Sequence, residues 1–440
     1  MEIQSIGPNE FLSIDGPASV RVIDGRLYVL GVEYGPGSSF TVMRGRRIIA
    51  KSLSECKIET VLGPDGKIET INGANEVIDI WDKALSTIRL RNSTVVVMGA
   101  MDVGKTTVTT ILVNKGVKEG LKVGVIDGDP GQNDIGPPTT ISASIATSFI
   151  THLTQLRNLR SIFVKTTSIE HVWDYVLNSM TKIVNELWHN YNVDAVVINT
   201  DGWISEENAI KFKLELTRRT GANHVVVIKR GDESTDLLKE LMKIAVNVIT
   251  IPSPPNARVR DRDDRKIRRE MGYSKYLMPS RELNVNLREK PIVNLPLFNG
   301  LRYDNYITRL IRRSLNMAIH YIEQWRGAAV AIGNVKDFQI RNIGGVNIAI
   351  LPMNWERGLL VALEDRDNYL LSLGVLRKIY YNTGKAVISV PKTFINEGLV
   401  DHIRLGMIRV NDNYEEVEKV LYINRIESLL SSQNILENSN

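Results

Sequence analysis

The feature that most constrains the fold is a glycine-rich loop, Gly-Ala-Met-Asp-Val-Gly-Lys-Thr-Thr, at residues 99–107. It matches the pattern G-x-x-x-x-G-K-[ST], whose glycines let successive backbone N–H groups turn towards phosphate oxygens. The apolar run 94–98 precedes the loop, and Val108, Ile111 and Leu112 follow it at helical spacing. Because a helix N-terminus adds positive potential at that point, a strand, loop and helix in this order predict a nucleotide-binding α/β core.

Four further apolar, β-branched runs alternate with helical patterns as far as about residue 280. They are residues 123–126, 195–198, 224–228 and 246–251. Strands that are buried on both faces have this composition, and their alternation with helices indicates a parallel sheet. The sequence therefore predicts a P-loop NTPase core with a parallel sheet.

The regions on both sides of this core have a different character. Residues 1–75 contain short alternating segments separated by glycine turns, which predicts a small β-domain. A helix of roughly 15 residues is expected to follow it. After a helical stretch at 305–325, short β-like segments return, which predicts a mostly β C-terminal domain. The expected domains are 1–75, 76–285 and 286–440, and residues 433–440 are expected to fray.

Composition excludes several classes of protein. A single cysteine cannot form an internal disulfide, and the six histidines show no metal-ligand spacing. No run reaches the ~18 apolar residues of a membrane span, and the N-terminus lacks a signal-peptide pattern. We therefore expect a cytoplasmic protein without membrane association. The net charge is +5, and residues 258–270 alone hold seven basic and four acidic residues, a local net charge of +3.

Candidate phosphoryl-transfer residues lie at the ends of the first two predicted strands. Lys105 would reach the β- and γ-phosphates of a nucleotide, and Thr106 would bind Mg²⁺. The second strand ends in Asp127 and Asp129. Ligands bind at the carboxyl ends of strands in open α/β sheets, so one carboxylate should hold magnesium and one could deprotonate an acceptor hydroxyl.

Three other segments bear on which phosphoryl transfer is involved. The guanine-specific Asn-Lys-x-Asp is absent, because residues 228–232 are Ile-Lys-Arg-Gly-Asp. In the basic segment, Arg258/Arg262 and Arg265/Arg269 are pairs at i,i+4, able to clamp phosphate oxygens as a lid or to form a solvated helix face. Trp203 follows the third strand and could stack on a nucleobase or belong to the core.

Together these motifs resemble the polynucleotide 5'-hydroxyl kinase family, which includes archaeal RNA kinases and eukaryotic kinases and scaffolds of RNA processing. The resemblance rests on the phosphate loop at 99–107, Asp-x-Asp-x-Gly-Gln at 127–132, Thr-x-Gly-Trp at 200–203 and the arginine-rich segment. It covers about residues 90–280. It implies that ATP, with Mg²⁺, donates its γ-phosphoryl group to the 5'-hydroxyl of an RNA or DNA end, and that protein partners from RNA processing are to be expected.

The resemblance also assigns roles to residues. It makes Asp129 the general base, with Lys105 on the phosphates and Arg265 and Arg269 as the preferred lid pair; Arg258 and Arg262 are the alternative pair. The remaining assignments are Gly99, Asp102, Val103, Gly104, Thr106 and Thr107 together with Lys105 for the nucleotide, Thr106 and Asp127 for magnesium, and Gln132, Thr200, Gly202 and Trp203 for the nucleic acid.

Two residues depart from the family pattern: Pro130 follows the general base, and Asp201 replaces a small residue near the expected nucleic acid. Two alternatives to an active kinase are an ATP-binding scaffold of an RNA-processing complex and a nucleotide-dependent switch ATPase. The presence of Lys105, Asp129 and the arginine segment favours activity. The loop lacks a second basic residue facing a partner, which disfavours the switch ATPase.

Overall fold

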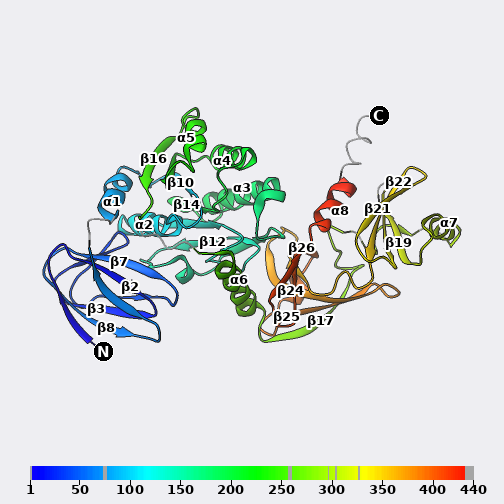
Figure 1. Cartoon of the computed structure of the whole chain (residues 1–440), viewed down its shortest axis with the longest axis horizontal. Coiled ribbons are helices and arrows are strands. Elements are labelled where there is room, and N and C mark those ends of the chain that lie inside the picture. Colours follow the sequence, from blue (N-terminus) through cyan, green and yellow to red (C-terminus); the bar gives the residue numbers. More distant parts are fainter. Residues whose placement is uncertain are drawn as a thin grey trace. The chain divides into compact units, whose positions relative to one another are not determined.

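The computed structural model describes residues 2–72, 77–255, 260–295, 297–302, 305–325 and 328–431. The chain folds into two compact units (Figure 1). The first contains Met1–Gly136, Ile141–Arg160 and Val172–Asp261, and the second contains Pro137–Thr140, Ser161–His171 and Arg262–Asn440. The N-terminal β-domain and the phosphate loop both belong to the first unit, so each unit is described separately below.

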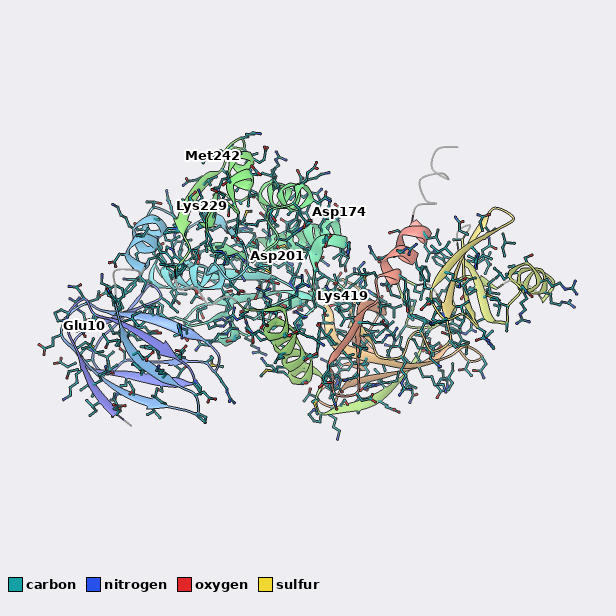
Figure 2. All side chains as sticks on the ribbon, viewed as in Figure 1. Glu10, Asp174, Asp201, Lys229, Met242 and Lys419 are labelled. Atoms are coloured by element: carbon teal, nitrogen blue, oxygen red, sulfur yellow. The ribbon has the colours of Figure 1, made fainter. Side chains whose placement is uncertain are left out.

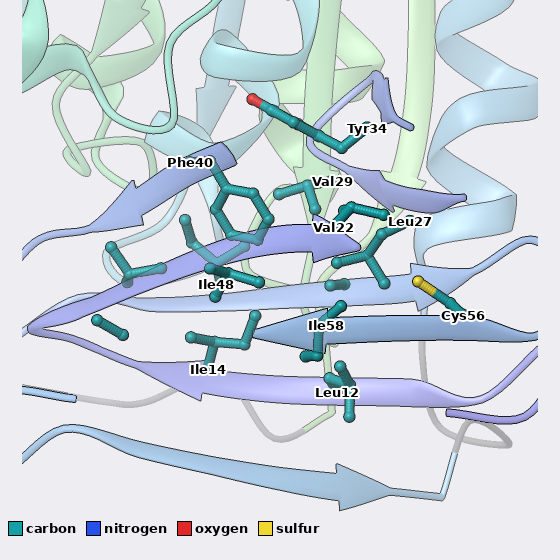
Figure 3. Close-up of a cluster of buried hydrophobic side chains, with 14 of the residues drawn as sticks. Leu12, Ile14, Val22, Leu27, Val29, Tyr34, Phe40, Ile48, Cys56 and Ile58 are labelled. Carbon is teal, nitrogen blue, oxygen red and sulfur yellow. The ribbon is translucent and has the colours of Figure 1, made fainter. Parts of the chain in front are cut away.

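The N-terminal region consists of two antiparallel sheets, which confirms its predicted β character. One has the order β1-β8-β3-β6 and the other β5-β4-β7-β2-β9. The strands are β1 Glu2–Ile6, β2 Phe11–Asp15, β3 Ala18–Asp24, β4 Leu27–Val29, β5 Val32–Tyr34, β6 Ser39–Val42, β7 Arg47–Ser52, β8 Cys56–Leu62 and β9 Lys67–Ile71. Side chains from both sheets form one buried cluster, which includes Leu12, Ile58 and the free thiol of Cys56 (Figure 3).

The core of the first unit is a seven-stranded sheet with the order β13-β12-β11-β14-β10-β15-β16. Its strands are β10 Ser93–Gly99, β11 Val123–Gly128, β12 Thr140–Ala146, β13 Arg160–Phe163, β14 Ala195–Thr200, β15 His224–Lys229 and β16 Asn247–Pro252. Neighbours among β10, β11, β14, β15 and β16 pair in parallel. All five predicted core strands are thus confirmed, and two strands are additions: β12, which pairs antiparallel to β11, and β13.

The core helices are α1 Ile78–Ser86, α2 Lys105–Lys118, α3 Trp173–His189, α4 Glu207–Arg219 and α5 Thr235–Leu241, with the 3₁₀ turn η2 Leu153–Gln155; the 3₁₀ turn η3 Ile169–His171 belongs to the second unit. Helix α1 is shorter than predicted, and the expected boundary at 73–76 lies outside the described residues. Strand β10 lies between β14 and β15, so the chain continues to opposite sides of it. The phosphate loop therefore follows the strand at which the sheet order reverses, the usual position of a ligand site.

The second unit is mostly β, as predicted. It has a six-stranded sheet, β17-β25-β24-β23-β26-β27, and a five-stranded sheet, β18-β19-β20-β22-β21. Its elements are α6 Arg262–Leu277, β17 Ser280–Asn286, β18 Leu301–Arg302, α7 Asn305–Leu315, β19 Ile319–Trp325, β20 Ala328–Gly333, β21 Gln339–Ile343, β22 Val346–Pro352, β23 Leu359–Glu364, β24 Leu370–Tyr380, β25 Lys385–Pro391, η4 Glu397–Leu399, β26 His402–Val410, β27 Glu416–Lys419 and α8 Tyr422–Ser431.

One prediction for the second unit is wrong. The stretch 305–325 is not a single helix, because α7 ends at Leu315 and β19 occupies the second half. Asn316 has a φ of 50°, a left-handed conformation that ends a helix. Residues 433–440, expected to fray, lie outside the described residues. Within the part of the chain that the structure describes, no helix is both long and apolar enough to span a membrane.

Candidate active site

The phosphate loop has the backbone conformation that its sequence predicts. Gly99, Asp102 and Gly104 all have positive φ angles, of 151°, 58° and 104°. A Cβ atom on Gly104 would lie 2.9 Å from the indole ring of Trp81, so only glycine fits. That indole is itself fixed, because its Nε1 donates to the carbonyl oxygen of Pro252 at 2.8 Å. Helix α1 and the end of β16 therefore hold the loop from outside.

Lys105, the first residue of α2, is buried in the loop. Its Nζ donates to the carbonyl oxygen of Ala100 at 2.6 Å. Burial lowers the pKa of Lys105 to about 8, while the charges of Asp129 and Asp201 act in the opposite direction. The structure thus brings the loop lysine together with one carboxylate from each of the two neighbouring strand ends, as expected where parallel strands terminate side by side.

Asp127 lies within β11 and is fully buried. Its Oδ2 accepts from the backbone N–H of Asp134 at 2.7 Å, and its Oδ1 accepts from Nδ2 of Asn199 at 3.1 Å. The strand register explains the second bond, because Asn199 of β14 stands opposite both Asp127 and Val97. Burial, with the charge of Asp134, raises the pKa of Asp127. The carboxylate is therefore held in one orientation by its neighbours.

Asp129 occupies the turn after β11. Its Oδ1 accepts from the backbone N–H groups of Gly131 at 2.9 Å and Gln132 at 3.1 Å, which fixes the carboxylate over its own turn. Burial, followed by the charge of Asp201, raises the pKa of Asp129 to about 6, and Lys105 opposes this shift. A carboxylate with a pKa near neutrality is suited to accept a proton from a hydroxyl group. The Gln132 side chain donates to the carbonyl oxygen of Gly131 at 2.6 Å.

The segment 200–203 after β14 is built into the core. Thr200 is buried and its hydroxyl donates to the carbonyl oxygen of Val97 at 2.8 Å, which ties the segment to β10. A Cβ atom on Gly202 would lie 2.3 Å from Cγ of Met101, so glycine allows close packing on the phosphate loop. Thr200 therefore uses its hydroxyl inside the core, and Gly202 lets the segment pack closely on the phosphate loop.

Asp201, which the sequence marked as a departure, has a partner that sequence reasoning missed. Its Oδ1 forms an ion pair with Nζ of Lys213 on α4, a side chain with no exposed surface (Asp201 is labelled in Figure 2). Its Oδ2 accepts from the backbone N–H of Trp203 at 2.9 Å. Lys213 thus compensates the negative charge of Asp201 inside the protein.

Trp203 is half-buried, and its ring lies against Phe212, with centroids 6.4 Å apart. The indole Nε1 is buried and has no hydrogen-bond partner among the described residues. Part of the ring is thus core and part remains accessible. Both interpretations of this tryptophan, as core residue and as stacking platform, are compatible with that position.

The arginine-rich segment is divided between the two units. Arg269 on α6 makes a bidentate ion pair with Glu416 of β27, with both N–O distances at 2.7 Å, and Tyr273 donates to the same carboxylate at 3.0 Å. Arg269 is therefore committed to a structural contact in the second unit, which the sequence could not reveal because its partner is 147 residues away. Arg265 lies one turn earlier on α6, and Arg258 lies outside the described residues.

An arginine that the sequence did not select contacts the phosphate loop. Arg260 donates from its backbone N–H to Oδ2 of Asp102 at 3.0 Å and from Nη1 to Oδ1 at 2.9 Å. Both residues belong to the first unit. Arg260 lay within the basic segment but outside both i,i+4 pairs, so helical spacing alone gave no reason to choose it.

A parallel sheet with a phosphate loop at the reversal of strand order, and carboxylates at the ends of β11 and β14, defines a P-loop nucleotide-binding protein. A family model described as the P-loop of mRNA cleavage and polyadenylation factor CLP1 matches residues 99–278. The match covers the segment that carries the motifs and confirms their resemblance to this family.

Curated relatives extend the similarity beyond that segment. A polyribonucleotide 5'-hydroxyl-kinase of Methanocaldococcus jannaschii is 24% identical over 325 residues, covering 73% of this chain and 88% of the relative. One of Pyrococcus abyssi is 26% identical over 333 residues, covering 73% and 89%. The solved structure of a Clp1p–Pcf11p complex matches with a TM-score of 0.58 at 12% identity, covering 93% of this chain and 97% of the other. That likeness confirms the fold.

Proposed function

We propose that the protein is an ATP-dependent polynucleotide kinase that transfers the γ-phosphoryl group of ATP to a 5'-hydroxyl end, with RNA as the first candidate acceptor. The observation that carries the proposal is the pairing of Lys105 with Asp129: each shifts the other's pKa in the direction that favours its charged form. A phosphate-binding lysine beside a proton-accepting carboxylate is the arrangement that phosphoryl transfer to a hydroxyl requires. The archaeal relatives carry names for this activity, which supports the assignment.

In this mechanism the 5'-oxygen forms a bond to the γ-phosphorus while the bond to the β–γ bridging oxygen breaks, leaving ADP. Asp129 accepts the proton of the attacking hydroxyl. Lys105 would leave the Ala100 carbonyl to meet the phosphates. Gln132, Thr200, Gly202 and Trp203 would form the acceptor side: Trp203 would stack on a terminal base, and Thr200 and Gly202 would fix its position. Arg265 would supply positive charge from α6, and Arg269 would steady that helix through Glu416.

Magnesium fits the donors at this site. The hydroxyl of Thr106 and the carboxylate of Asp127 are hard oxygen ligands, and Mg²⁺ commonly takes one or two protein oxygens together with phosphates and waters. No cluster of three or more metal-binding His, Cys, Asp or Glu side chains occurs among the described residues, which suits such a shared site rather than a closed protein cage. When bound, Mg²⁺ would neutralise charge on the β- and γ-phosphates.

The test incubates the full chain with γ-labelled ATP, Mg²⁺ and a 5'-hydroxyl oligonucleotide, in separate RNA and DNA reactions. We expect label on the RNA 5' end. Asp129→Asn keeps an oxygen acceptor for the turn, so it should retain ATP binding and lose transfer, whereas Lys105→Ala should weaken both. Asp174→Asn, an exposed change on α3, is the control that should leave transfer intact. ATP binding without any label on either oligonucleotide would refute the kinase and favour an ATP-binding scaffold.

A further inference from the structure

Asp102 places a negative charge in a loop that binds anions. It stands between Met101 and Val103 in the phosphate loop, with a φ of 58°, and only 9% of its side chain is exposed. A carboxylate close to bound triphosphate repels it, and partial burial strengthens that repulsion because less water screens the charges. Asp102 therefore needs a positively charged partner at the loop.

Arg260 supplies that counter-charge. Its backbone N–H and its Nη1 each bond one oxygen of the Asp102 carboxylate, at 3.0 and 2.9 Å, so both main chain and side chain are held. The Arg260 side chain remains 26% exposed. Among the described residues, Nη1 is the one guanidinium nitrogen of Arg260 with a protein partner, which leaves Nε and Nη2 for a ligand. A guanidinium can bond a carboxylate with one edge and a phosphate oxygen with another.

We propose that Asp102 is a positioning residue that holds Arg260 at the phosphate loop, where Arg260 contacts the terminal phosphate of the bound nucleotide. The proposal rests on the proposed function and adds a contacting arginine from the first unit. Asp102 and Arg260 together carry no net charge, so the pair does not repel bound ATP. As charge develops on the transferred group, the fixed guanidinium stabilises it without having to be recruited from solvent.

The experiment is a double-mutant cycle on the full chain, with ATP affinity and kcat measured separately. Asp102→Asn preserves shape, and asparagine tolerates positive φ well, so the loop conformation is retained. It removes one negative charge and loosens Arg260, so ATP affinity should stay within about twofold while kcat falls about 100-fold. Arg260→Gln removes the guanidinium that pairs with Asp102 and should weaken ATP binding by about tenfold as well as lowering kcat.

The double variant separates the two roles. With neither charge present, ATP affinity should return to the wild-type value, but kcat should stay low because no arginine is held at the loop. Arg44→Gln, which breaks an exposed ion pair with Asp65, is the matched control and should change neither quantity. Thermal unfolding of every variant checks that the fold is kept.

Two results would overturn the proposal. If Asp102→Asn retains full kcat, Asp102 does not position a catalytic group. If the double variant binds ATP no better than Arg260→Gln, charge compensation is not what the pair provides. The affinity measurements are independent of transfer: if the wild type phosphorylates no oligonucleotide, recovery of ATP affinity in the double variant still supports the pairing, and its absence still refutes it.

Discussion

The ion pair between Asp201 and Lys213 should be among the most sensitive points of the core. Lys213 has no exposed side-chain surface, and the Asp201 side chain is 12% exposed. The lysine Nζ also lies 5.1 Å from the ring centroid of Phe212, inside the packing of α4. Removing either partner leaves the other charge buried without its counter-ion.

The expected cost follows from that burial. Breaking a buried pair by removing one partner typically costs about 3 to 5 kcal/mol, whereas replacing both charges together is often close to neutral. Asp201→Asn keeps an oxygen to accept the N–H of Trp203, so its cost isolates the lost charge. Lys213→Met keeps most of the side-chain volume. Each single change should lower the free energy of unfolding by about 3 to 5 kcal/mol, and the double change by about 1 kcal/mol or less.

The assay is urea unfolding of the full chain, combined with hydrogen exchange of the β14 and α4 peptides to locate the change. Asp65→Asn is the control: it makes the same Asp-to-Asn change, but the ion pair of Asp65 with Arg44 is exposed. It should cost well under about 1 kcal/mol. If Asp201→Asn is equally mild, or if the double variant is as unstable as the sum of the single ones, the pair is not desolvated as described.

Three further outcomes can be measured directly. His402 of β26 is buried, and burial acts to lower its pKa. Hydrogen bonds to Glu364 and a second carboxylate outweigh this effect and raise the pKa of His402 overall. The stability that His402 contributes is therefore complete below its ordinary pKa and is lost as the pH rises through the raised pKa. The urea midpoint of the second unit should therefore fall as the pH rises above about 6.5, and His402→Gln should flatten that slope. Gly104→Ala should abolish ATP binding in a calorimetric titration, because its Cβ would collide with Trp81; retained affinity would show that the loop can shift. Trp203→Ala should weaken oligonucleotide binding by about 5- to 100-fold with little effect on ATP, as loss of one stacked base predicts, and equal losses would argue for a core role alone.

Local patterns in the sequence were enough to predict the core strands and the phosphate loop, because a buried parallel strand and a glycine-rich turn each need particular residues in succession. The error at 305–325 has a local cause as well: apolar residues at 311, 315, 319 and 322 continue helical spacing across Asn316, whose left-handed φ ends the helix. Of these apolar residues, Ile319 and Ile322 lie in strand β19.

The sequence did not reveal which charged side chains form pairs between elements that are distant along the chain. Asp201 looked unfavourable because its partner is on another element, although one signal was present: Lys213 occupies the buried stripe of α4 with Ala209, Phe212 and Leu216. A lysine at an apolar helical position predicts a buried counter-ion somewhere, without naming it. Arg260 and Arg269 gave no such signal, since a run of basic residues does not show which of them meet carboxylates.

The contacts of α6 bear on how its arginines could act. Tyr273 and Leu277 belong to the hydrophobic cluster of the six-stranded sheet, and Glu270 accepts from the backbone N–H of Glu416 at 2.8 Å. With the bidentate pair of Arg269 on the same glutamate, the helix is fixed to β27 at three side chains. Arg265, one turn before Arg269, therefore lies on a helix whose position within the second unit is set by these contacts.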